Sequence, residues 1–217
     1  MRTPIDPLAI ATSSDPAQRR IFRSKVDTIR PTYGFEDVSL APGTSTIEPN
    51  DVSLGQVLCG IELAIPIIAS AMDAVVDVRL AREIARLGGL AIMNLEGVQT
   101  RYEDPDAVLA RIAAAPDDAV HDLLAEAYAA PIRDDLIARR IDELHAAGSR
   151  AAVAATPGAA RRFGQLCAEH GADLFLVQSQ VSSARHLASE YEPLSLEEFT
   201  RFMPIPVAVG SLKDHFR

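Results

Sequence analysis

Short apolar runs alternate with segments of helical spacing along most of this chain. Five runs have the length and composition of buried strands: Ile65–Ser70, Leu90–Asn94, Arg150–Ala155, Leu174–Val177 and Ile205–Val209. Helical spacing appears between these runs, in Val78–Leu87, Arg133–Ala147, Gly158–His170 and Leu196–Phe202, and residues 104–148 are helical in character. The alternation predicts βαβ crossovers and a parallel sheet. Periodicity alone does not separate a closed barrel from an open, doubly wound sheet.

The pattern divides the chain into three parts. Residues 1–64 are polar or rich in Pro, Gly, Ser and Thr, which indicates an amino-terminal arm and an extended lead-in segment with turns. Residues 65–210 carry the five strands and their helices. Residues 211–217, SLKDHFR, are charged and patternless, so no helix is expected to cover the run Ile205–Val209. We therefore expect an incomplete fold with an open sheet edge.

Composition and charge narrow the classes of partner. The formal net charge is −9, which disfavours nucleic acid, although helix or loop N–H groups could still bind a phosphorylated metabolite. The two cysteines, Cys59 and Cys167, lack metal-ligand spacing, so neither a disulfide framework nor a metal site is expected. No signal peptide or membrane-spanning run is visible, and we expect a cytoplasmic protein without a membrane partner.

Three motifs in one order carry a resemblance to a known family. They are GFEDVSLAPGTSTIEPNDVSL, then IPIIASAMDAV, then GGLAIMN. This order resembles the IMP dehydrogenase/GMP reductase family, from about Tyr33 to Gly210. The segment MNLEGVQTRYEDPDAVLARIA is similar to a bacterial branch that lacks the regulatory CBS modules. The resemblance implies a (β/α)₈ TIM barrel, of which this chain would form roughly the amino-terminal half, with about five parallel strands.

The resemblance also implies a purine-nucleotide site at the carboxyl ends of the strands. Ser70 and Met72 would contact the nucleotide, and Asp73 and Asn94 are further candidates. Three of the four have a structural alternative: Met72 could pack in the core, Asp73 could cap the following helix or form a turn, and Asn94 could be a turn residue. The nucleotide would be IMP, GMP or XMP, and IMP dehydrogenase and GMP reductase activities fit the residues equally.

The expected cofactor, NAD or NADP, follows from the same resemblance. The cofactor candidates are Gln178, Ser179 and Gly210, at the ends of the last two strands. The dehydrogenases of the family have an Asp-Ser-Ser-His-Gly type sequence where this chain has Gln178-Ser179-Gln180, so the family's aspartate is missing here.

The family's chemistry uses a cysteine thiolate that attacks purine C2 while a hydride moves to or from the nicotinamide. Neither Cys59 nor Cys167 matches that cysteine, so no catalytic residue is assigned. We expect the chain to be truncated before the catalytic loop. We expect an oxidoreductase of this family that is inactive as this fragment. The alternative is a non-catalytic truncated paralogue, either a gene remnant or a partner of full-length relatives. Intact members are expected to be homo-oligomers.

Overall fold

The computed structural model describes residues 33–178 and 194–210. Contacts divide the chain into two units, Met1–Val52 and Ser53–Arg217. The described part of the first unit contains two short 3₁₀ turns, η1 (Phe35–Asp37) and η2 (Pro49–Asp51). The parallel sheet and the candidate site lie in the second unit.

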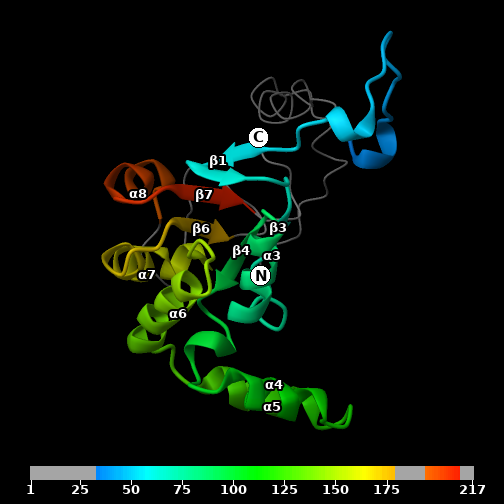
Figure 1. The fold of residues 1–217 in the computed structure, drawn as a ribbon. Coiled ribbons are helices and arrows are strands. Elements are labelled where there is room, and N and C mark those ends of the chain that lie inside the picture. Colours follow the sequence, from blue (N-terminus) through cyan, green and yellow to red (C-terminus); the bar gives the residue numbers. More distant parts are fainter. Residues whose placement is uncertain (1–32, 179–193, 211–217) are drawn as a thin grey trace, which may run out of the picture. The chain divides into compact units, whose positions relative to one another are not determined.

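Five parallel strands form the sheet, in the order in which they occur in the sequence (Figure 1). They are β3 (Ile68–Ala69), β4 (Leu90–Asn94), β5 (Ala152–Ala155), β6 (Leu174–Gln178) and β7 (Val207–Gly210). The connecting helices are α3 (Val78–Arg86), α4 (Pro105–Ala113), α5 (Val120–Ala129), α6 (Asp134–Ala146), α7 (Pro157–Glu169) and α8 (Leu196–Phe202), with the 3₁₀ turn η3 (Val98–Thr100) after β4. This half-barrel confirms the expected fold class.

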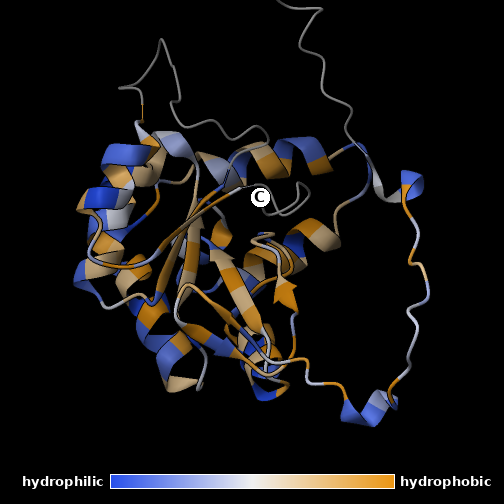
Figure 2. Cartoon of the chain, turned by 90° about the horizontal axis from the view of Figure 1, so that it is seen from above, coloured by the Kyte–Doolittle hydropathy of each residue, from blue (hydrophilic) through white to orange (hydrophobic). Residues whose placement is uncertain are grey.

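The central strands β4, β5 and β6 are buried on both faces, toward which their alternate residues point. One face packs against the helices, through Phe175 and Val153 of the strands and Ile137 and Leu144 of α6. The hydrophobic colouring runs along the strands and the facing sides of the helices, whereas the outer helix faces are largely hydrophilic (Figure 2). Burial on both faces explains why the central strands read as continuous apolar runs.

The opposite face of the sheet is covered in part by a hairpin. Its strands, β1 (Gln56–Leu58) and β2 (Ile61–Leu63), pair antiparallel, and Ile61 and Leu63 pack with β4, β5 and β6 side chains. Cys59 and Gly60 both have positive φ, 49° and 82°, as a two-residue hairpin turn of the primed type requires. We expected only an extended segment with turns here. The hairpin was missed because a Cys occupies a turn position usually held by Asn, Asp or Gly.

The first strand is shorter than expected. We predicted Ile65–Ser70, but only Ile68–Ala69 pairs with β4. Pro66 has no N–H for a ladder, and the N–H of Ile65 donates to the carbonyl of Gly88 before β4 begins. Ile67 is 53% exposed, so this run is not buried on both faces and that expectation was wrong. The other four strands lie within two residues of their predicted bounds.

The edge of β7 gives a first testable prediction. None of the described strands pairs with its outer side, which leaves ladder N–H and C=O groups open to another chain. We expect the purified chain to self-associate as its concentration rises, which sedimentation velocity over a concentration series would detect. A monomer with one sharp, cooperative unfolding transition at every concentration would contradict this.

Candidate active site

The strand register gathers four of the candidate residues at the carboxyl ends of the sheet. Gln178 lies directly beside Gly210, and Asn94 lies beside Ala154 on the neighbouring strand. Asn94 lies two residues after Ile92 and therefore on the same face of β4 as Leu90 and Ile92. Gln178 likewise shares a face of β6 with Leu174 and Leu176. On both strands this is the face of the sheet away from the helices. Ser70 follows β3 on the same alternation as Ile68. In a barrel these positions surround the active site.

Met72 projects from the turn that follows β3. Its N–H donates to the carbonyl of Ser70 at 2.6 Å, and its own carbonyl accepts from Val75 and Val76. The side chain is 56% exposed. Within the described residues Met72 is therefore not packed in the core, which was its structural alternative.

Asp73 is held by hydrogen bonds to residues distant in the sequence. Its Oδ1 accepts from the N–H of Val98 at 2.9 Å, and its Oδ2 accepts from the hydroxyl of Tyr128. The cap of α3 is instead Asp77, whose Oδ1 accepts from the N–H of Leu80 at 2.7 Å. Helix capping by Asp73 is therefore wrong.

Gly97 allows this close approach of the Asp73 carboxylate. A Cβ on Gly97 would lie 1.7 Å from Asp73 Oδ1 and 2.1 Å from its Cγ. Its backbone has ordinary φ, so the requirement for glycine here comes from space and not from conformation. The turn after β3 and the turn after β4 therefore pack directly on each other.

Tyr128 is a site residue that the sequence analysis missed. It lies near the end of α5 and is 41% exposed, and its pKa is raised to about 12 by partial burial and by the hydrogen bond to Asp73. The Arg101 guanidinium lies 5.6 Å from the centre of its ring. No local signal could have paired residues 55 positions apart, because only the return of α5 to the sheet brings them together.

A second polar link joins the ends of β4 and β5. Asn94 Oδ1 accepts from the N–H of Glu96 at 2.9 Å, which is the turn role considered for it. The Glu96 carboxylate accepts from the N–H and hydroxyl of Thr156, at 2.5 and 3.1 Å. Thr156 precedes α7 and makes no side-chain cap of its own, so Glu96 places negative charge at that helix start.

Two of the three cofactor candidates, Gln178 and Gly210, lie in the described part of the chain. Gln178 is half-buried at the end of β6, and Gly210 ends β7. No described atom lies within 4 Å of the position that a Cβ on Gly210 would occupy. Ser179 lies outside the described residues.

Neither cysteine lies at a carboxyl end of the parallel strands. Cys59 is exposed in the β1–β2 turn, and Cys167 is buried in α7. Burial raises the pKa of Cys167 to about 12, which keeps its thiol protonated at neutral pH. The two cysteines form no disulfide with each other.

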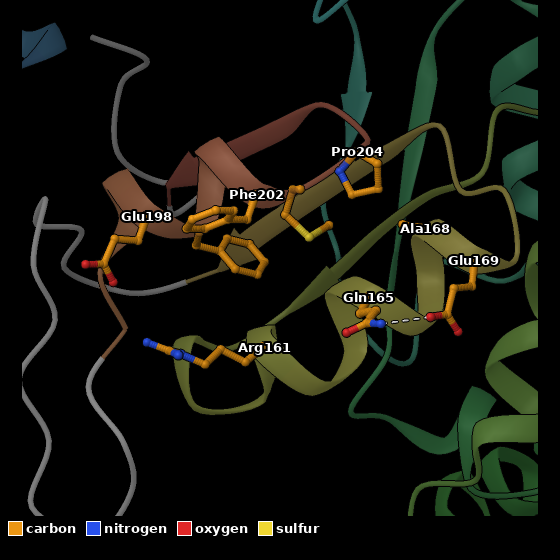
Figure 3. Close-up of a pocket in the computed structure, with 9 residues that line it drawn as sticks. Arg161, Gln165, Ala168, Glu169, Glu198, Phe202 and Pro204 are labelled. Carbon is orange, nitrogen blue, oxygen red and sulfur yellow. Dashed lines mark hydrogen bonds between the residues drawn. The ribbon is translucent and has the colours of Figure 1, made fainter.

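A groove of about 680 Å³ lies elsewhere, in the helix layer between α7 and α8 (Figure 3). Gln165 of α7 faces Phe202 and Pro204 across it. None of the candidate residues lines it, so it is separate from the site at the strand ends.

Comparison with known proteins gives concordant results. A family model described as IMP dehydrogenase / GMP reductase domain matches residues 32–194. An uncharacterized oxidoreductase of Mycobacterium tuberculosis is 34% identical over 194 residues, which is 87% of this chain and 52% of that protein. Inosine-5'-monophosphate dehydrogenase of Methanocaldococcus jannaschii is 39% identical over 74 residues, 34% of this chain and 15% of its own.

A solved structure supports the same conclusion. The IMP dehydrogenase/GMP reductase-like protein of Corynebacterium glutamicum superposes with a TM-score of 0.75 at 28% identity, over 86% of this chain and 50% of that one. The chain thus spans about half the length of the Mycobacterium and Corynebacterium proteins that it matches. Within the described ranges, no helix has the length and apolar character to cross a membrane. By its matched domain and its half-barrel, the chain belongs to the IMP dehydrogenase/GMP reductase family.

Proposed function

We propose that this half-barrel carries part of the purine-nucleotide site of a nicotinamide-dependent oxidoreductase. The observation that supports this most directly is the convergence of polar candidates at the carboxyl ends of neighbouring strands, beside an exposed Met72. Ligands of parallel α/β folds bind at these ends. The substrate would be IMP, GMP or XMP, and the residues favour neither direction of the redox reaction.

Each candidate has a proposed role that suits its chemistry. The Met72 thioether would pack against the flat purine, because sulfur is polarizable and the side chain is already exposed. Ser70 would donate or accept a hydrogen bond beside it, and Asn94 would do so from the adjacent strand. Asp73 would hold the turn between them, since both of its oxygens accept bonds from the protein.

The proposed cofactor is NAD or NADP. Gln178 would bind it through its amide and Ser179 through its hydroxyl, and Gly210 would allow it to approach the backbone. When bound, the nicotinamide supplies or accepts the hydride at purine C2. No carboxylate ends β6 in the described chain, so the family's aspartate contact has no counterpart there.

We also propose that the chain alone does not complete the reaction. A thiolate must reach purine C2, and a buried thiol with a pKa of about 12 cannot serve. Cys59, in the hairpin turn, is not placed at a strand end either. The nucleophile would have to come from residues other than these two.

A second candidate is a non-catalytic partner of full-length relatives. The edge of β7, unpaired among the described strands, favours it. Co-purification with a tagged full-length relative would support this candidate, and its loss on adding proline within β7 would locate the contact.

Nucleotide binding tests the main proposal. Replacing Met72 by alanine should weaken binding of IMP or GMP to the 217-residue chain about tenfold, because an apolar contact of roughly 1–2 kcal/mol is lost. Isothermal titration calorimetry measures the dissociation constants. Leu87→Ala is the matched control, since Leu87 is 54% exposed but follows α3 at its far end.

The outcomes separate the parts of the proposal. If no purine nucleotide binds, or if Leu87→Ala weakens binding as much as Met72→Ala, the assignment of the site fails. Steady NAD(P)H-linked turnover by the chain would contradict the expected inactivity, and its persistence after both cysteines are replaced would overturn the cysteine mechanism.

A further inference from the structure

The helices α4 and α5 form a pair that leaves the sheet after β4 and returns to it before α6 (Figure 1). The two helices contact each other and are joined by an ion pair between Arg111 and Glu126, at 2.9 Å. The bases of the pair are also joined, because the N–H of Arg133 donates to the carbonyl of Thr100 at 2.9 Å. The pair is therefore anchored at the edge of the candidate site.

The returning helix α5 is held close to the turn after β4. The hydroxyl of Tyr102 donates to the carbonyl of Ala127 at 3.0 Å, one residue before Tyr128. The Arg101 guanidinium donates to the carbonyl of Ala130, and to the carbonyl of Glu96 at 3.1 and 3.3 Å. These bonds set where the Tyr128 hydroxyl can reach.

From this position Tyr128 donates to Asp73, the residue after Met72. The other carboxylate oxygen of Asp73 is taken by the N–H of Val98, and Gly97 is packed against the carboxylate. Asp73 is thus held by the turn after β4 on one side and by the α4–α5 pair on the other. A phenol-to-carboxylate bond is charge-assisted and about twice as strong as a neutral one.

We propose that Tyr128 is a positioning residue, whose hydroxyl holds Asp73 so that Ser70 and Met72 present one preformed surface to the purine nucleotide. This inference rests on the function proposed above. It adds that the α4–α5 pair helps to position the nucleotide-binding residues. Preorganised contacts increase affinity because less conformational freedom is lost on binding. Tyr128 itself does not contact the nucleotide in this scheme.

The raised pKa of Tyr128, about 12, is consistent with this role. Partial burial and the neighbouring Asp73 carboxylate both disfavour the phenolate, and they outweigh the opposing effect of Arg101. The hydroxyl therefore remains a donor at neutral pH.

The test compares two tyrosine-to-phenylalanine variants in the same segment of the chain. Tyr128→Phe removes the bond to Asp73, and Tyr102→Phe removes a hydroxyl bond to a backbone carbonyl of α5. We expect Tyr128→Phe to raise the dissociation constant for GMP or IMP about fivefold or more, as loss of one net hydrogen bond would. Tyr102→Phe should weaken binding less than Tyr128→Phe does, because it removes one of several bonds that hold α5 and leaves the Tyr128–Asp73 bond in place.

A spectroscopic measurement checks the contact itself, independently of binding. The chain has four tyrosines and no tryptophan, so tyrosinate absorbance at alkaline pH reports on few groups. The unaltered chain should contain one tyrosine that ionises only near pH 12, and Tyr128→Phe should remove it. Asp73→Asn should lower the pKa of that tyrosine, because it removes the carboxylate that raises it.

The outcomes distinguish this inference from the function on which it rests. If Met72→Ala weakens nucleotide binding and Tyr128→Phe does not, the positioning role is overturned while the proposed function stands. If the high-pKa tyrosine is absent, or is unaffected by Asp73→Asn, the contact is absent and the inference fails. If the unaltered chain binds no purine nucleotide, the proposed function fails, and the role assigned to Tyr128 fails with it.

Discussion

Replacing Phe175 by alanine is expected to lower the free energy of unfolding by about 4 kcal/mol. Phe175 is fully buried on β6, in the cluster between the sheet and the helices. Its ring meets that of Phe199 of α8 edge to face, with centroids 5.8 Å apart. The substitution removes this contact and leaves a cavity that the close-packed interior fills only in part. Urea denaturation followed by circular dichroism measures the loss.

Phe202→Ala is the matched control for this experiment. Phe202 lies on the same helix as Phe199, but its side chain is 80% exposed, beside the groove between α7 and α8. Its loss should change the stability by less than about 0.5 kcal/mol. Similar losses for the two variants would show that β6 is not the centre of this core.

The second large effect is expected at Arg140, a buried cation on α6 that is 5% exposed. Its guanidinium donates to the carbonyls of Gln99, Tyr102 and Glu103, at 2.9, 3.2 and 3.2 Å. It also pairs with Glu143 at 2.5 Å. Arg140→Met leaves these acceptors without their donor, and we expect a loss of about 3 kcal/mol in the free energy of unfolding.

Arg139→Met provides the control, because Arg139 pairs with the same Glu143 at 2.8 Å but is 52% exposed. We expect a much smaller loss, since water screens an exposed pair. If the two variants lose equal stability, the ion pair matters and the buried carbonyl contacts do not. Because Arg140 joins α6 to residues 99–103, its loss should also loosen the base of the α4–α5 pair.

The Arg140 effect should depend on pH in a defined direction. Burial of Glu143 acts to raise its pKa, but hydrogen bonds from Arg140 and Arg139 outweigh burial and leave the pKa below its ordinary value. A lowered folded-state pKa contributes stability above the unfolded pKa, and that contribution is lost as pH falls through the folded one. The difference between unaltered chain and Arg140→Met should therefore shrink in acid.

The sequence predicted the interior strands well, because each is an apolar run buried on both faces. Leu90–Asn94 was predicted with its observed bounds, and Leu174–Val177 differs from β6 by one residue. The helix α6 was also predicted to within one residue at each end, and its apolar residues Leu136, Ile137, Ile141 and Leu144 are all buried. The predictions were wrong or incomplete in the segment that precedes the sheet. Pro66 prevents a full first strand, and the hairpin turn at Cys59 was not predicted because Cys is an unusual residue for such a turn.

In the candidate site, too, local features could be predicted from the sequence and contacts between distant residues could not. Alternation along a strand is local, so the positions of Asn94 and Gln178 at strand ends could be read from the sequence. The bonds from Tyr128 to Asp73 and from Glu96 to Thr156 could not, because they join residues 55 and 60 positions apart.

The sequence by itself determined the family, the order of strands and helices, and which residues end the strands, since these depend on periodicity and on motifs within a few turns of chain. Only the tertiary structure decided that Asp73 binds Tyr128 and does not cap a helix, that Met72 is exposed, and that Arg140 is buried among carbonyls. The reason is physical: a polar side chain takes whichever donor or acceptor the packed elements bring within reach, and that choice is made between segments distant in sequence.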